Sequence, residues 1–108
     1  MPLSGKQKRF LRAQAHALEP IVMVGKEGLT PTVVSAVSDA LHAHELIKVR
    51  VLESSPVARK EVSERLPAQT KSELAGQVGH VLILYKRHPQ DARIVLPREK
   101  DHVALPNR

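Results

Sequence analysis

The stretch IVMVGKEGLTP, residues 21–31, decides how this chain is organised. Residues 21–24 form a continuous apolar run, which predicts a buried strand of a parallel or mixed sheet. The glycines at 25 and 28 then indicate a tight loop. Thr30 is a good N-cap and Pro31 suits the first helical position, so a helix is predicted to follow. The unit is therefore a strand, a glycine loop and a helix.

The flanking residues continue this alternation of helix and strand. Before the unit, Ser4 and Gln7 have the spacing of a capping box that opens a helix, and Pro20 must end that helix. After the unit, residues 46–52 alternate between apolar and polar side chains. This alternation predicts a half-exposed strand with Lys48 and Arg50 on its open face.

The remaining residues complete the predicted fold. Ser55-Pro56 resembles Thr30-Pro31 and predicts the start of a third helix. Residues 74–78 form a weak strand pattern, and Gly79-His80 predicts a tight turn into the strong strand at 81–85. The order α-β-α-β-α-β-β predicts an α/β fold with a four-stranded mixed sheet. We expect one domain over residues 1–98 and a flexible tail over 99–108.

Composition narrows the class of protein. The 108 residues include no cysteine, which excludes a disulfide framework and a cysteine-ligated zinc site and fits a reducing cytoplasm. No apolar run approaches the roughly 20 residues that cross a bilayer, and the N-terminus lacks the apolar stretch of a secretory signal. A basic transit peptide in residues 1–18 stays open. We expect a cytoplasmic protein that makes no membrane contact.

The positive charge is concentrated at the two ends of the chain. The formal net charge is +6. Residues 1–20 contribute +3, residues 21–85 contribute 0, and residues 86–108 contribute +3. Such an excess favours a polyanion partner, most often nucleic acid, although a solubilising surface is the plainer alternative. Phe10 and Tyr85 are the only aromatic residues. A ring-stacking platform for bases is therefore excluded, and RNA would be held through its phosphates and shape.

The glycine loop is the strongest candidate site. Gly25 and Gly28 let a ligand approach the backbone, Lys26 adds a charge, and the following helix start favours anions. A nucleic-acid backbone could be clamped there, as in the GXXG loop of a KH domain. The alternative is a purely structural turn. Lys48 and Arg50 would lie close to this loop if their strand is the parallel neighbour; otherwise they are a solvated strand face.

Catalysis and metal binding have little support in the sequence. The six histidines are scattered, and no HExxH motif or histidine-carboxylate cluster occurs. The loop lacks the third glycine of a dinucleotide fingerprint and the Gly-Lys-Ser/Thr of a Walker loop. We therefore predict no enzyme activity, no cofactor, no metal and no small-molecule substrate.

Several ordered motifs together resemble one known family. They occupy residues 3–8, 22–30, 44–51, 78–87 and 96–98. The resemblance is to the CRM domain, named for chloroplast RNA splicing and ribosome maturation, in its stand-alone bacterial YhbY-type form. It covers roughly residues 3–98. It implies a fold similar to the C-terminal domain of translation initiation factor three. It also implies RNA binding through the GxxG loop and association with precursors of the large ribosomal subunit.

The resemblance assigns residues to the candidate site by position. Gly25, Lys26 and Gly28 fall in the loop, with Lys48 and Arg50 on the adjoining strand. With the cations of the two basic ends, the candidate RNA-binding residues are Lys6, Arg9, Arg12, Gly25, Lys26, Gly28, Lys48, Arg50, Lys86 and Arg87.

Some features depart from the family pattern, and other functions stay open. Glu27 places an acid in the loop, and Lys71 stands where a glycine is usual. We expect a monomeric, non-enzymatic RNA-binding protein that joins ribosomal RNA in the large-subunit precursor. The alternative is a scaffold whose basic ends dock acidic partner proteins. A small hydrolase or nucleotide-binding enzyme is disfavoured by the missing motifs.

Overall fold

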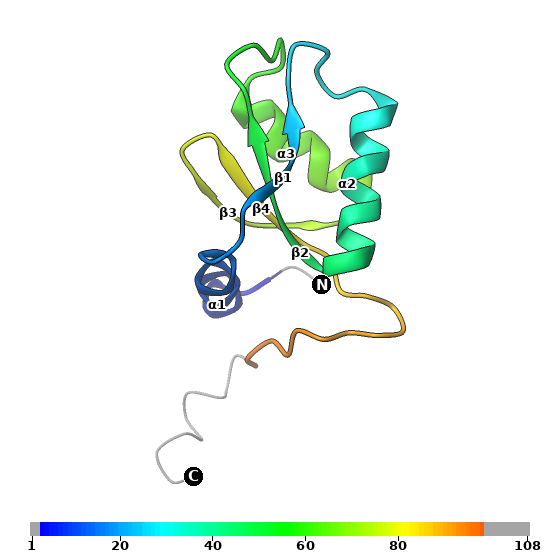
Figure 1. The fold of residues 1–108 in the computed structure, drawn as a ribbon. Coiled ribbons are helices and arrows are strands. Elements are labelled where there is room, and N and C mark those ends of the chain that lie inside the picture. The colour runs from blue at the N-terminus through cyan, green and yellow to red at the C-terminus, as the bar shows by residue number, and fades with distance from the viewer. Residues whose placement is uncertain (1–2, 99–108) are drawn as a thin grey trace, which may run out of the picture.

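The computed structural model describes residues 3–98, and the predicted tail at 99–108 lies outside them. The order of elements is the predicted one (Figure 1). The helices are α1 (Gly5–Ala15), α2 (Pro31–His44) and α3 (Arg59–Thr70). The strands are β1 (Pro20–Val24), β2 (Leu46–Val51), β3 (Glu73–Val78) and β4 (Val81–Tyr85).

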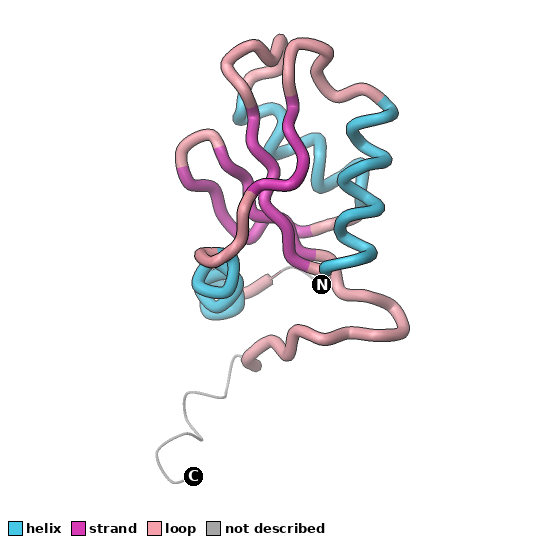
Figure 2. Tube along the Cα trace, in the orientation of Figure 1, coloured by secondary structure: helices cyan, strands magenta, loops and turns pink. Residues whose placement is uncertain are grey.

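The four strands form one mixed sheet in the order β1-β2-β4-β3. β1 is parallel to β2, while β4 is antiparallel to both β2 and β3. This confirms the predicted α/β fold with its terminal hairpin. Because β1 and β2 run the same way, the loops that follow them lie at the same end of the sheet (Figures 1 and 2).

Helices cover the two faces of the sheet unequally. The larger core joins α2 and α3 to one face and includes Val37, Leu66 and Leu84. The smaller core joins α1 to the other face and includes Leu11, Ile83 and Tyr85. α1 is a single helix at one end of its face (Figure 1), so part of that face stays open.

The local helix signals of the first two helices are confirmed. The Ser4 hydroxyl accepts from the Gln7 backbone N–H at 3.1 Å, and the Gln7 side chain accepts from the Ser4 N–H. The Thr30 hydroxyl accepts from the Val33 N–H at 3.1 Å, with Pro31 at the first helical position. Each cap satisfies backbone donors that the first helical turn leaves unpaired.

The prediction that residues 21–24 form a fully buried strand is wrong. β1 is an edge strand, and burial alternates along it. Ile21 is 52% exposed and Met23 is 48% exposed, whereas Val24 is buried. An apolar run does not reveal how many neighbours a strand has on each side, and β1 has a partner on one side only.

The predicted start of the third helix is also wrong. α3 begins at Arg59, and its N-cap, Ala58, makes no side-chain capping bond. The Ser55 hydroxyl instead accepts from the Val57 N–H, two residues on, at 3.1 Å. This local turn competes with helix capping, so Ser55-Pro56 belongs to the loop before α3.

The end of α3 offers a test of backbone strain. The helix continues past Pro67 to Thr70 and stops at Lys71, which has the left-handed conformation (φ 55°, ψ 42°). Such a conformation is costly for a residue with a Cβ atom and nearly free for glycine. We expect Lys71→Gly to raise the free energy of unfolding by about 0.5–1 kcal/mol in urea titrations. Lys71→Ala keeps the strain, so an equal gain from it would contradict this account.

The segment after β4 is held by a buried carboxylate. Glu45 lies between α2 and β2 with a φ of 66° and is only 3% exposed. Its oxygens accept from the backbone N–H groups of His88, Arg93 and Ile94 at 2.8–3.0 Å. Ile94 and Leu96 then pack against the smaller core. We call residues 88–96 the C-terminal strap.

Candidate nucleic-acid interface

The glycine loop is a tight turn braced by the neighbouring loop. The Gly28 N–H donates to the Gly25 carbonyl at 2.9 Å. Gly28 is buried and has a φ of 74°, and a Cβ atom there would lie 3.4 Å from Pro56. The backbone N–H groups of Lys26 and Glu27 make no hydrogen bond within residues 3–98. The turn therefore offers two free backbone donors and the Lys26 ammonium at its exposed tip.

The two glycines have different structural roles, which mutation can separate. Gly25 has no positive φ, and its Cβ position has only ordinary contacts at 3.6 Å or more. Gly28→Ala is expected to lower the free energy of unfolding by about 1–2 kcal/mol because of its left-handed conformation. Gly25→Ala should change it by less than about 0.5 kcal/mol. Urea unfolding of both variants checks this, and equal losses would contradict it.

The expected neighbourhood of the turn and the basic strand is confirmed. β1 is the parallel partner of β2. Met23, which precedes Gly25 by two residues, pairs with Arg50. Arg50 lies on the face that α1 leaves partly open, because Val49 and Val51 point into the larger core. Within residues 3–98 the Arg50 guanidinium has no hydrogen-bond or ion-pair partner. It is therefore available to an anion.

A groove of about 780 Å³ runs between α1 and this open face. Its basic lining side chains are Arg12, His16, Lys48 and Arg50, and its floor includes Val81 and Ile83. Glu19 is the one acidic residue in the lining. A concave surface on which positive charge predominates concentrates the field and attracts polyanions.

Two of the groove cations already hold backbone carbonyls. Arg12 donates to the Ala75 carbonyl at 3.1 Å, and Lys48 donates to the Leu18 carbonyl at 2.9 Å. Both acceptors are neutral carbonyls, so neither contact neutralises a positive charge. The Arg12 side chain lies across β3, where a Cβ atom on Gly76 would collide with its Cγ and Cδ atoms.

The other predicted cations do not join the groove. Lys86 and Arg87 follow β4, whose end pairs with the start of β2, whereas the turn lies beyond the end of β2. The length of β2 puts about 17 Å between these ends. Lys6 donates to the Arg98 carbonyl at 3.1 Å, and Lys86 donates to the Thr70 carbonyl at 3.3 Å. Arg9 is exposed on α1, one turn before Arg12. The candidate residues therefore form two separate surfaces.

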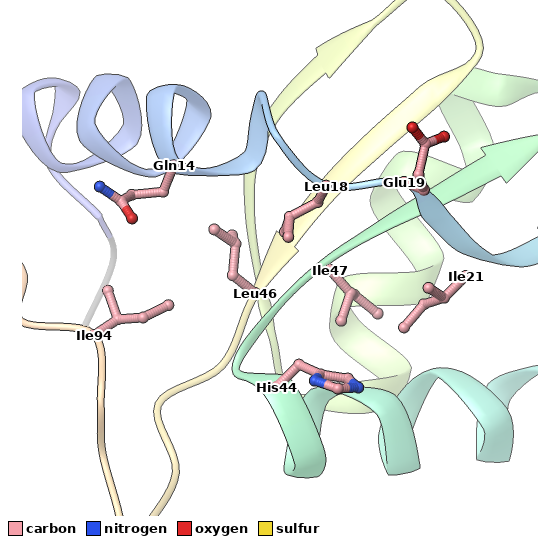
Figure 3. A pocket seen from close by; sticks show the side chains of 8 residues that line it. All are labelled: Gln14, Leu18, Glu19, Ile21, His44, Leu46, Ile47 and Ile94. Atoms are coloured by element: carbon pink, nitrogen blue, oxygen red, sulfur yellow. The ribbon is translucent and has the colours of Figure 1, made fainter.

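A second, apolar hollow lies near the edge strand (Figure 3). It measures about 340 Å³, and its lining includes Leu18, Ile21, Leu46 and Ile94. The Glu19 carboxylate points away from the other lining side chains (Figure 3). The described part of the chain holds no group of three or more side chains that could bind a metal ion. None of its helices is long and apolar enough to cross a membrane.

Comparison with known proteins identifies the family. Residues 3–86 match the model of the CRS1 / YhbY (CRM) domain, so this chain belongs to that family. It is 42% identical over 95 residues to "Probable RNA-binding protein YqeI" of Bacillus subtilis (strain 168), covering 88% of this chain and 99% of that protein. It is 41% identical over 97 residues to an "RNA-binding protein" of Haemophilus influenzae, covering 90% and 97% respectively.

A solved structure supports the fold independently. The solution structure of the hypothetical protein SAV1595 from Staphylococcus aureus is 39% identical in sequence and superposes with a TM-score of 0.75. The comparison covers 88% of this chain and 99% of that one. The predicted membership of the CRM family is thus confirmed together with the arrangement of helices and strands.

Sequence reasoning missed the role of Glu45 and the contact that Arg12 makes with β3. Glu45 anchors the strap, yet an acid between a helix and a strand carries no signal of burial. The contact of Arg12 with β3 did have a signal in the sequence. A glycine inside a strand often marks a close approach by another group, and Gly76 is where the Arg12 side chain crosses β3.

Proposed function

We propose that this protein is a non-enzymatic RNA-binding module that joins ribosomal RNA in cytoplasmic precursors of the large ribosomal subunit and assists its assembly. Membership of the CRM family supports the RNA partner. So do the names of its relatives in Bacillus subtilis and Haemophilus influenzae. The ribosomal part of the proposal rests on the resemblance of the sequence to YhbY-type proteins.

The observation that carries the proposal is that the strand leading into the glycine turn pairs with Arg50, which lines the basic groove. The parallel pairing of β1 and β2 sets Met23, two residues before the glycine turn, opposite Arg50, and Lys48 follows along the same strand face. Free backbone N–H groups and cations on one surface match the spaced charges of a sugar-phosphate chain. The turn would clamp the backbone while the groove neutralises the phosphates that follow.

Counterion release gives the first test. A protein that neutralises phosphates displaces condensed cations, so the logarithm of the binding constant falls by roughly 0.7–0.9 per phosphate for each tenfold rise in salt. With the Lys26, Lys48 and Arg50 surface engaged, we expect a slope of about −2 to −3. Fluorescence titrations of a large-subunit RNA fragment at several salt concentrations measure it. A flat response would rule out the proposed interface.

The ribosomal destination has its own test. Tagged protein is expected to sediment with large-subunit precursors in a sucrose gradient and to leave those fractions after ribonuclease treatment. Absence from the precursor fractions would contradict the assembly role and leave general RNA binding. Persistence after ribonuclease would favour a scaffold that contacts ribosomal proteins.

A further inference from the structure

The open part of the sheet carries a row of four side chains that runs across all four strands. Strand register aligns Met23 of β1 with Arg50 of β2, Arg50 with Val81 of β4, and Val81 with Val78 of β3. Neighbouring strands lie about 4.8 Å apart, so the row is about 14 Å long. We call these four residues the cross-strand row.

Three of the four side chains are aliphatic, and two of them are unusually exposed. Met23 is 48% exposed and Val78 is 66% exposed. α1 buries the other end of this face, where Leu46, Ile83 and Tyr85 join the smaller core. Over the cross-strand row no helix within residues 3–98 takes that place (Figure 1). The row is an apolar strip interrupted by the guanidinium of Arg50, which is unpaired within residues 3–98.

The surroundings of the row favour a nucleic acid over an apolar protein partner. Arg50 has no partner within residues 3–98, and a guanidinium can stack on a base and hydrogen-bond a phosphate. Val78, Val81 and Arg50 also line the basic groove. Met23 precedes the glycine turn by two residues. An RNA strand held at that turn would reach the row next.

An apolar strip distinguishes unpaired RNA from duplex RNA. In an A-form helix the faces of the bases are hidden in the stack, and the protein meets mainly phosphates and 2′-hydroxyls. Unpaired bases expose their faces and gain from contact with flat or apolar side chains. Apolar side chains without aromatic rings can also supply such contact, although each contact contributes less binding energy.

We propose that the cross-strand row receives the bases of an unpaired RNA segment whose backbone is held at the glycine turn. This inference rests on the proposed function and adds to it the class of RNA. Phosphate contacts determine the salt slope, and base contacts determine the affinity that persists at high salt. The two contributions are therefore separable in one titration series.

The test compares a single-stranded oligonucleotide with a duplex of the same length. The variant Met23→Gln with Val78→Ser removes apolar contact without changing charge. Val95→Ser is the matched control, because Val95 is 83% exposed on the C-terminal strap. We expect the double variant to lose about three- to tenfold in affinity for the single strand, with the salt slope and duplex affinity unchanged. Thermal unfolding should match that of the natural chain, since both sites are exposed.

The outcomes separate this inference from the proposed function. The base contact is overturned if the double variant binds the single strand as tightly as the natural chain does, or if the natural chain prefers the duplex. In either case a steep salt slope would still support the proposed function. An equal loss in Val95→Ser also overturns it. A flat salt response of the natural chain overturns both.

Discussion

A chain with both Lys26→Glu and Arg50→Glu is expected to bind large-subunit RNA about 100-fold more weakly than the natural chain at 0.1 M salt. At this concentration each lost phosphate contact costs about five- to tenfold in affinity, and the new carboxylates add repulsion. The salt slope should also fall by about 1.5. Neither side chain has a partner within residues 3–98, so stability should change little. Fluorescence titration across a salt series measures both quantities.

The matched control for this experiment lies elsewhere on the molecule. Lys60→Glu with Lys71→Glu makes the same change in net charge on and just after α3, which covers the opposite face of the sheet. We expect this control to lose less than about fivefold, because charges beyond a Debye length of about 10 Å are screened at this salt. A loss as large as that of Lys26 and Arg50 would show that net charge, and not the surface beside the turn, sets the affinity.

Glu45→Gln is expected to lower the free energy of unfolding by about 1.5–3 kcal/mol at pH 7. The carboxylate accepts three backbone N–H groups, two on one oxygen and one on the other. Glutamine keeps one acceptor oxygen but replaces the other with an NH₂ group. That group would face a backbone N–H of the strap, and two donors cannot hydrogen-bond each other. Urea unfolding measures the loss. Gln77→Glu, at an exposed position near the end of β3, makes the reverse change from amide to carboxylate. This control should alter stability by less than about 0.5 kcal/mol.

The same site predicts how stability depends on pH. Burial raises the pKa of Glu45, but the backbone hydrogen bonds from His88, Arg93 and Ile94 and the charge of His88 outweigh it and hold the pKa below its ordinary value of 4.5. The folded state therefore binds this proton less readily than the unfolded state. Its stabilising effect is complete above about pH 5 and is lost as the pH falls through the lowered value. The difference in stability between the natural chain and Glu45→Gln should shrink below pH 5, and a constant difference would contradict this.

Local signals predicted the elements that depend on neighbours in sequence. Ser4 and Thr30 cap their helices as expected because each hydroxyl reaches an N–H three residues away. Ser55 carries the same signal and fails, since a bond to Val57 two residues away satisfies it first. The edge position of β1 could not be predicted from the sequence, for another reason. Strand order is set by packing across the sheet and leaves no mark on an apolar run.

The candidate site was predictable in part. The nearness of the turn and Arg50 followed from a parallel pairing that the strand-helix alternation already implied. The division of the cations into two surfaces did not follow, because the sequence gives no sign that Lys86 and the turn lie at opposite ends of β2. The carbonyl contacts of Arg12 and Lys48 depend on how α1 crosses the sheet. Such long-range contacts are not encoded in local periodicity.

The C-terminal strap makes the folding unit longer than the segment that defines the family. The family match ends at residue 86, after all seven helices and strands. A chain cut there would keep every regular element, yet Ile94 and Leu96 would no longer shield the smaller core, and the Glu45 carboxylate would lose its three backbone donors. Without those donors, no strap contact would hold the pKa of Glu45 below its ordinary value. Recombinant chains that stop at residue 86 should therefore aggregate more readily and lose the pH dependence of stability that Glu45 provides. Chains that extend past Leu96 should unfold cooperatively as one unit.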